Sequence, residues 1–286
     1  MTIDLKLWED LDTDERRAFG YDISAWGDDI TEPQIPIDFA FHRTSWGLHV
    51  DSKYDNHSGK ISEITDILGG YHYYSTAVPW KKQVDHFLEL VTNNPNGSKY
   101  EMIAWDFEAK NNILSRRAAK EAAEAIRYLR IGFDGMVLVY GNNNDYSVFL
   151  ETFVDVAFLN DTPFWLPWPG SRIKNPFSVE INEQPEMGNW RGNWPNRRFV
   201  PLKRLKGTWD FWQYSWNGDP EKLGIVGKKQ VDVNVYNGTR ADLRERLNMD
   251  GDTPTPDPPT PPDDTEVRNN TLDEVNAMVE GMKSII

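Results

Sequence analysis

Two acidic residues stand two positions apart at the end of an apolar run near the middle of the chain. Residues 102–105 are typical of a short buried strand, and Asp106 and Glu108 follow it directly. Because residues i and i+2 of a strand point to the same side, about 6.5 to 7 Å apart along the backbone, we expect the two carboxyl groups to share one face. Like charge and partial burial raise a carboxyl pKa, so one group can stay protonated beside an ionised neighbour. This combination suits acid catalysis at a glycosidic bond.

An isolated D-x-E motif also has a simpler interpretation, a solvated turn or a helix N-cap after the strand. The motif therefore gains meaning only if other strands deliver further groups to the same place. Eight strand-like runs are present, and helix-length segments, such as residues 115–130, separate most of them. This alternation predicts an α/β fold, a (β/α) barrel whose strands converge at their C-terminal ends. The runs are residues 21–26, 36–47, 69–75, 102–110, 135–141, 163–168, 208–215 and 231–236.

The composition predicts four parts along the chain. Residues 1–19 are polar and are expected to form an N-terminal arm, and residues 20–249 the catalytic barrel. Residues 250–270 are rich in Pro, Thr and Asp, which is typical of an extended linker. Residues 271–286 predict a short amphipathic helix that either self-associates, docks on a partner protein or is a frayed end. Its apolar stripe consists of Leu272, Val275, Val279, Met282 and Ile286.

The overall composition excludes several classes of function. A formal net charge of −14 argues against nucleic-acid binding, and zero cysteines exclude thiol nucleophiles and thiolate metal sites. The five histidines lack the spacing of metal ligands, so we expect no metal. No run is long enough to span a membrane, and the acidic N-terminus does not resemble a signal peptide. Twelve tryptophans favour carbohydrate as a partner, because aromatic faces stack on sugar rings.

One basic stretch, residues 191–206, stands out in this acidic chain. It could meet an anionic wall polymer or a substrate carboxylate. A solvated loop is the more common explanation of such a charge run.

Five motifs at predicted strand ends together resemble glycoside hydrolase family 25, the Chalaropsis-type lysozymes. They are D-I-S at 22–24, G-Y-H-Y-Y at 70–74, D-F-E at 106–108, W-Q-Y-S at 212–215 and G-I-V-G-K-K-Q-V-D-V-N-V-Y-N-G-T at 224–239. The likeness covers residues 20–247. It implies a flattened, TIM-like (β/α) barrel that needs no cofactor. It also implies cleavage of the β-1,4 bond between N-acetylmuramic acid and N-acetylglucosamine in bacterial peptidoglycan.

The resemblance assigns roles to four acids. Glu108 matches the family's general acid, and Asp106 the carboxylate that orients or stabilises the substrate's 2-acetamido group. Asp22 and Asp232 match two flanking aspartates, although on their own they could be a turn residue and a structural hydrogen-bonding residue. Inversion and acetamido-assisted retention both remain open. We favour assistance, because Asp106 comes from the same strand as the acid.

Six further residues are predicted to line a substrate cleft. They are His72, Tyr74, Tyr140, Trp165, Gln213 and Tyr214. For His72 a packed, hydrogen-bonded role inside the protein is about as good an explanation. The sequence also departs from the family pattern: Trp46 replaces an acidic or amide residue, the sixth strand reads W-L-P-W-P, and residues 170–207 form a longer segment than usual. These departures predict a cleft wall that differs from that of the family.

Two other functions compete with hydrolysis. One is a carbohydrate-binding barrel without turnover, which the presence of all four acids disfavours. The other is a structural component of a virion, suggested by the terminal helix and the absent export signal. We therefore expect a phage endolysin, a virion-borne lysozyme or an enzyme released without a Sec signal.

Overall fold

The computed structural model describes residues 17–25, 29–108, 116–141, 158, 161–167 and 209–249. The predicted linker and C-terminal helix, most of the predicted N-terminal arm, the basic stretch and residues 170–207 lie outside these ranges. Arg17, Ala18 and Phe19, which we assigned to the end of the arm, are buried. Within the described residues, no helix is long and apolar enough to cross a membrane.

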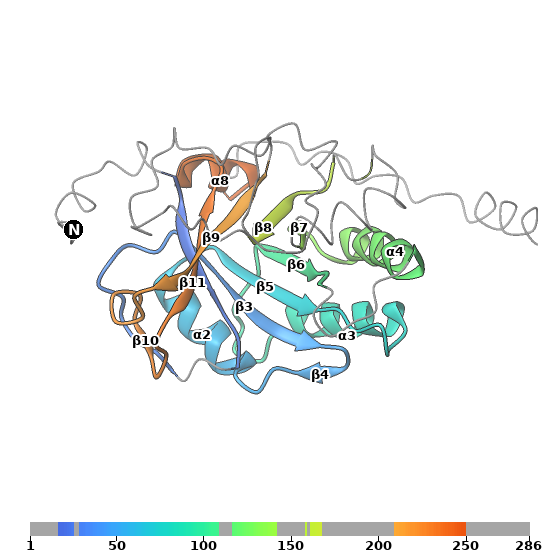
Figure 1. Cartoon of the computed structure of the whole chain (residues 1–286), viewed down its shortest axis with the longest axis horizontal. Coiled ribbons are helices and arrows are strands. Elements are labelled where there is room, and N and C mark those ends of the chain that lie inside the picture. The colour runs from blue at the N-terminus through green and yellow to red at the C-terminus, as the bar shows by residue number, and fades with distance from the viewer. Residues whose placement is uncertain are drawn as a thin grey trace, which may run out of the picture. The chain divides into compact units, whose positions relative to one another are not determined.

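Eight strands form a closed barrel in the order β1-β11-β9-β8-β7-β6-β5-β3, and pairing of β1 with β3 completes the ring. Each overlaps one of the eight predicted runs, so the predicted barrel is confirmed (Figure 1). The strands are β1 (Phe19–Ile23), β3 (Phe39–Trp46), β5 (Leu68–Tyr73), β6 (Met102–Asp106), β7 (Met136–Tyr140), β8 (Phe164–Pro167), β9 (Phe211–Gly218) and β11 (Val231–Tyr236).

One strand runs against the other seven, which corrects the expectation that all C-terminal ends converge. β11 is antiparallel to both of its neighbours, β1 and β9. The beginning of β11 therefore reaches the edge of the barrel where the other strands end. In this register Asp232, its second residue, pairs with Asp22 near the end of β1.

Short additional strands and four described helices accompany the barrel strands. β4 (His49–Val50) returns along β3 as a hairpin whose turn contains Gly47, with a φ of 56° that favours glycine. β2 (Asp29–Ile30) pairs with β10 (Ile225–Val226). The described helices are α2 (Tyr54–Ile64), α3 (Trp80–Thr92), α4 (Arg116–Gly132) and α8 (Arg240–Arg246), and α3 lies beside α4 (Figure 1).

Side chains alternate between two apolar layers along each strand. In β6, Met102 and Ala104 belong to the cluster that fills the barrel, where Phe41 stacks on Trp165 with ring centroids 4.4 Å apart. Ile103 and Trp105 belong to the second cluster, which includes the buried faces of α3 and α4. Asp106 continues the inward series, so the pattern that packs the barrel also sends this carboxyl group to its mouth.

Candidate active site

A cavity of about 560 Å³ opens where the described strands converge, and every one of the eight barrel strands, or the residues directly after it, contributes to its wall. Four carboxyl groups lie in this wall together with aromatic and amide side chains. The lining residues are Asp22, Ser24, Arg43, Trp46, Tyr71, Tyr73, Asp106, Glu108, Tyr140, Trp165, Gln213 and Asp232. All four acids singled out in the sequence are thus brought together, as are Tyr140, Trp165 and Gln213.

Asp106 and Glu108 keep the strand alternation beyond the end of β6. The Tyr74 amide donates to the Asp106 carbonyl (3.0 Å), and the Phe107 amide donates to the Tyr140 carbonyl (2.8 Å). These bonds extend the ladder past the strand, while the Phe107 side chain is fully buried in the outer layer. The expected geometry is confirmed, because both carboxyl-bearing residues line the cavity. Asp106 is buried and Glu108 is half-buried.

Two amides fix the carboxylate of Asp22. Its Oδ2 accepts hydrogen bonds from Gln213 Nε2 (2.7 Å) and Asn234 Nδ2 (2.8 Å). The amide oxygens face other donors: Tyr140 hydroxyl and Trp216 Nε1 donate to Gln213 Oε1, and Trp165 Nε1 donates to Asn234 Oδ1. Because each oxygen already accepts from a donor, each amide must turn its nitrogen to Asp22.

The surroundings of the Asp22 carboxyl group disfavour its ionised form. Burial raises the pKa of Asp22 well above its ordinary value, and the charge of Asp232 raises it further, against the lowering effect of the two amides. Burial also raises the pKa of Asp232, while Lys228 opposes the shift. Two neighbouring carboxyl groups with raised pKa values favour sharing one proton.

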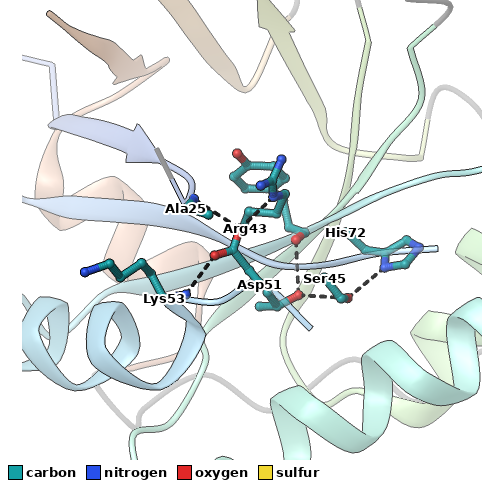
Figure 2. A network of polar contacts seen from close by, with 8 residues as sticks. Ala25, Arg43, Ser45, Asp51, Lys53 and His72 are labelled. Carbon is teal, nitrogen blue, oxygen red and sulfur yellow. Dashed lines mark hydrogen bonds and ion pairs between the residues drawn. The ribbon is translucent and has the colours of Figure 1, made fainter. Parts of the chain in front are cut away.

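The single cationic side chain among the described lining residues is that of Arg43. Its Nε donates to Asp51 Oδ2 (2.7 Å), and Asp51 also accepts from the backbone amides of Ala25 (3.1 Å) and Lys53 (2.9 Å). Figure 2 shows these three groups converging on the one carboxylate. Through these bonds the buried Asp51 connects the residues after β1, the strand β3 and the start of α2.

A model of glycosyl hydrolases family 25 matches residues 21–222, which is more than half of the chain. The chain belongs to glycosyl hydrolases family 25. This family 25 member is accordingly a glycoside hydrolase. The matched range contains Asp22, Asp106 and Glu108 and ends before Asp232, which the barrel itself brings to the site.

Several known proteins are similar to this family 25 barrel at low sequence identity. The bacterial lysozyme of Streptomyces coelicolor superposes with a TM-score of 0.60 at 19% identity, covering 82% of this chain and 98% of that one. The catalytic domain of the endolysin ply40 from Listeria monocytogenes bacteriophage P40 gives 0.56 at 16% identity, covering 81% and 97%. The uncharacterized protein YegX of Escherichia coli is 22% identical over 244 residues, 82% of this chain and 75% of that protein.

Three of the predicted cleft residues do not line the cavity of the family 25 barrel. His72 lies in the outer layer, with Nδ1 2.8 Å from Ser45 Oγ and Nε2 3.1 Å from Gln83 Oε1, and stacks on Trp105. Gln83 Nε2 donates to two carbonyls, so its Oε1 accepts and His72 carries its proton on Nε2. Burial lowers the pKa of His72 to about 3, so the ring is neutral. The structure therefore has His72 as a packed, hydrogen-bonded residue.

The other two, Tyr74 and Tyr214, are fully buried in the same outer layer. The Tyr74 hydroxyl donates to Glu121 Oε2 (2.8 Å) on α4. On β5 the two-residue period sends Tyr71 and Tyr73 into the cavity and His72 away from it. Strict alternation along G-Y-H-Y-Y could have found these two tyrosines. Ser24 and Asn234 stand two residues after Asp22 and Asp232, so the same alternation could have found both, whereas nothing in the sequence separates Arg43 from other polar strand residues.

Proposed function

We propose that this family 25 barrel hydrolyses the β-1,4 bond between N-acetylmuramic acid and N-acetylglucosamine in the glycan strands of peptidoglycan. One observation carries the proposal: four carboxyl groups from three strands meet in a cavity that also has aromatic walls. Two acids with distinct surroundings are what cleavage of a glycosidic bond needs. Aromatic side chains supply the faces that sugar rings stack on.

In the proposed reaction Glu108 is the general acid. It donates its proton to the glycosidic oxygen as the bond from this oxygen to the anomeric carbon breaks. The carbonyl oxygen of the substrate's own 2-acetamido group bonds to the anomeric carbon, and the ionised Asp106 stabilises the positive oxazolinium ion that results. Water then attacks the anomeric carbon, returns the acetamido group and gives a proton back to Glu108. Assistance fits better than inversion, because Asp106 sits two residues from the acid on the same strand.

Asp22 and Asp232 have a different role in the proposed reaction. Their raised pKa values favour one shared proton, which keeps the negative charge near the reacting centre below that of four ionised carboxylates. The two amides on Asp22 fix its direction. In this proposal the pair orients the substrate and tunes the field around Asp106 and Glu108.

The Glu108→Gln variant tests the proposal. The amide has nearly the same shape but cannot donate the proton, so clearing of a cell-wall suspension should slow by about 10² to 10⁴. Circular dichroism and thermal unfolding should match the wild type, because the side chain is only half-buried. A folded variant with wild-type turnover would remove Glu108 from the role of acid. A wild-type protein that binds walls without clearing them would instead indicate a carbohydrate-binding barrel.

A further inference from the structure

Trp46 differs from every other residue of the cavity wall. It is the last residue of β3, and 45% of its surface is exposed, whereas the remaining lining residues are buried or half-buried. The exposed part of this indole adds nothing to the stability of the folded protein, because it remains in contact with water. An exposed aromatic side chain in the wall of a cavity is better explained by a ligand that covers it.

The indole is held in place before any ligand arrives. Trp46 pairs with His49 across the β3–β4 hairpin, and their rings stack with centroids 4.3 Å apart at 27°. The Gly47 amide donates to the Tyr73 carbonyl (3.2 Å), which ties the turn of the hairpin to β5. At the base of the hairpin the Asp51 amide donates to the Thr44 carbonyl (2.9 Å), and the Arg43–Asp51 ion pair lies next to it (Figure 2). A ring fixed in this way loses little freedom when a ligand binds.

We propose that Trp46, backed by His49, is a stacking platform for a sugar ring of the glycan strand, at a subsite away from the bond that is cleaved. The proposal rests on the function proposed above. Asp22 and Asp106 are buried in the cavity wall and Trp46 is exposed in it, so we place the reacting centre at the buried carboxyl groups and Trp46 at the rim of the same cavity. The occupant is a pyranose ring because one of its faces carries C–H groups, which pack on an aromatic surface without needing a charge.

A distant subsite has a recognisable kinetic effect. Stacking there is present in both the bound substrate and the transition state, so its loss raises KM and leaves kcat nearly unchanged. A loss of tertiary structure, by contrast, would lower kcat for every substrate. The length of the glycan strand provides a second test of the Trp46 subsite. Only strands long enough to reach the rim should respond to Trp46.

The experiment compares Trp46→Ala, Trp46→Phe and His49→Ala with the wild type on peptide-free glycan strands of increasing length. We expect Trp46→Ala to raise KM for long strands about tenfold with kcat within about twofold, and to leave the shortest cleaved strand unaffected. Phenylalanine should restore most of the loss, and His49→Ala should give a smaller rise. The matched control is Tyr128→Ala, which removes an exposed aromatic residue of α4 that does not line the cavity.

The possible failures are distinguishable. Wild-type protein that cleaves no glycan refutes the proposed function, whereas active wild type with an unchanged KM in Trp46→Ala refutes only the platform. Binding of N-acetylglucosamine oligomers of two and five residues to Glu108→Gln, with and without Trp46→Ala, gives a readout free of turnover. Equal affinity of the pentamer for both proteins would also overturn the platform. An equal loss for dimer and pentamer would place Trp46 at the reacting centre.

Discussion

At the scale of single residues, Asp22 has the most constrained surroundings in the site. Its carboxyl group is 7% exposed, accepts from two amides and faces a second carboxyl group, that of Asp232. The amides favour the ionised form, but burial and the neighbouring charge favour the protonated one and outweigh them. Ionisation of such a group opposes folding.

The Asp22→Asn variant should therefore be more stable than the wild type at neutral pH. The folded-state pKa of Asp22 lies above the unfolded value of about 3.9, so ionisation opposes folding as soon as pH rises past that value. Asparagine keeps one oxygen to accept from Gln213 and Asn234 and never ionises. The gain in unfolding free energy should grow from nearly zero at about pH 4 to about 1 to 3 kcal/mol at pH 8. Urea unfolding across this range measures it.

The control for this prediction is Asp85→Asn on the exposed side of α3, where no such pH-dependent gain is expected. A gain in Asp22→Asn that is constant with pH would contradict the assignment, since it would come from packing rather than from ionisation.

At the scale of elements, the β3–β4 hairpin and the residues after β1 depend on Asp51. Three donors from different segments meet on its carboxylate, which has no exposed surface in the ion pair with Arg43. The hairpin carries both Arg43 and Trp46 into the cavity wall, so Asp51 holds Arg43 directly and positions Trp46 through the hairpin.

Asp51→Asn should lower the free energy of unfolding by about 1 to 3 kcal/mol, because at least one of the donors loses its acceptor inside the protein. Thermal or denaturant unfolding measures the loss. Asp66→Asn is the matched control: Asp66 also joins two arginines, Arg240 and Arg244, but it is 45% exposed, so its loss should be below about 1 kcal/mol. Equal losses in the two variants would mean that Asp51 does not hold the hairpin.

Much of this element-level arrangement could be predicted from the sequence, and the limits have physical causes. Apolar runs located all eight barrel strands, since each must be buried on two sides. The strand directions could not be predicted from these runs, because the antiparallel β11 carries the same alternation as a parallel strand. His72 was expected in the cleft although the two-residue period of β5 sends it outward. Asn234 stands on the same face of β11 as Asp232, but its partner Asp22 could not be predicted, because the contact spans 212 positions of the chain.

At the scale of the whole barrel, closure of the sheet brings distant parts of the sequence into one site. Asp22 comes from the first barrel strand, Asp106 and Glu108 from the fourth along the chain, and Asp232 from the last. The antiparallel direction of β11 is what brings Asp232 beside Asp22. The interior is filled by aromatic and aliphatic side chains, so the site sits on a packed floor.

The central claim, cleavage on the muramic acid side of the glycan, is tested most directly by mass spectrometry of digested peptidoglycan after borohydride reduction. Reduction marks the sugar that carries the newly formed reducing end. If Glu108 and Asp106 act as proposed, the reduced sugar in products of the wild-type enzyme should be N-acetylmuramitol, and Glu108→Gln should release almost none. Products ending in reduced N-acetylglucosamine would contradict the account, because the enzyme would then be a glucosaminidase.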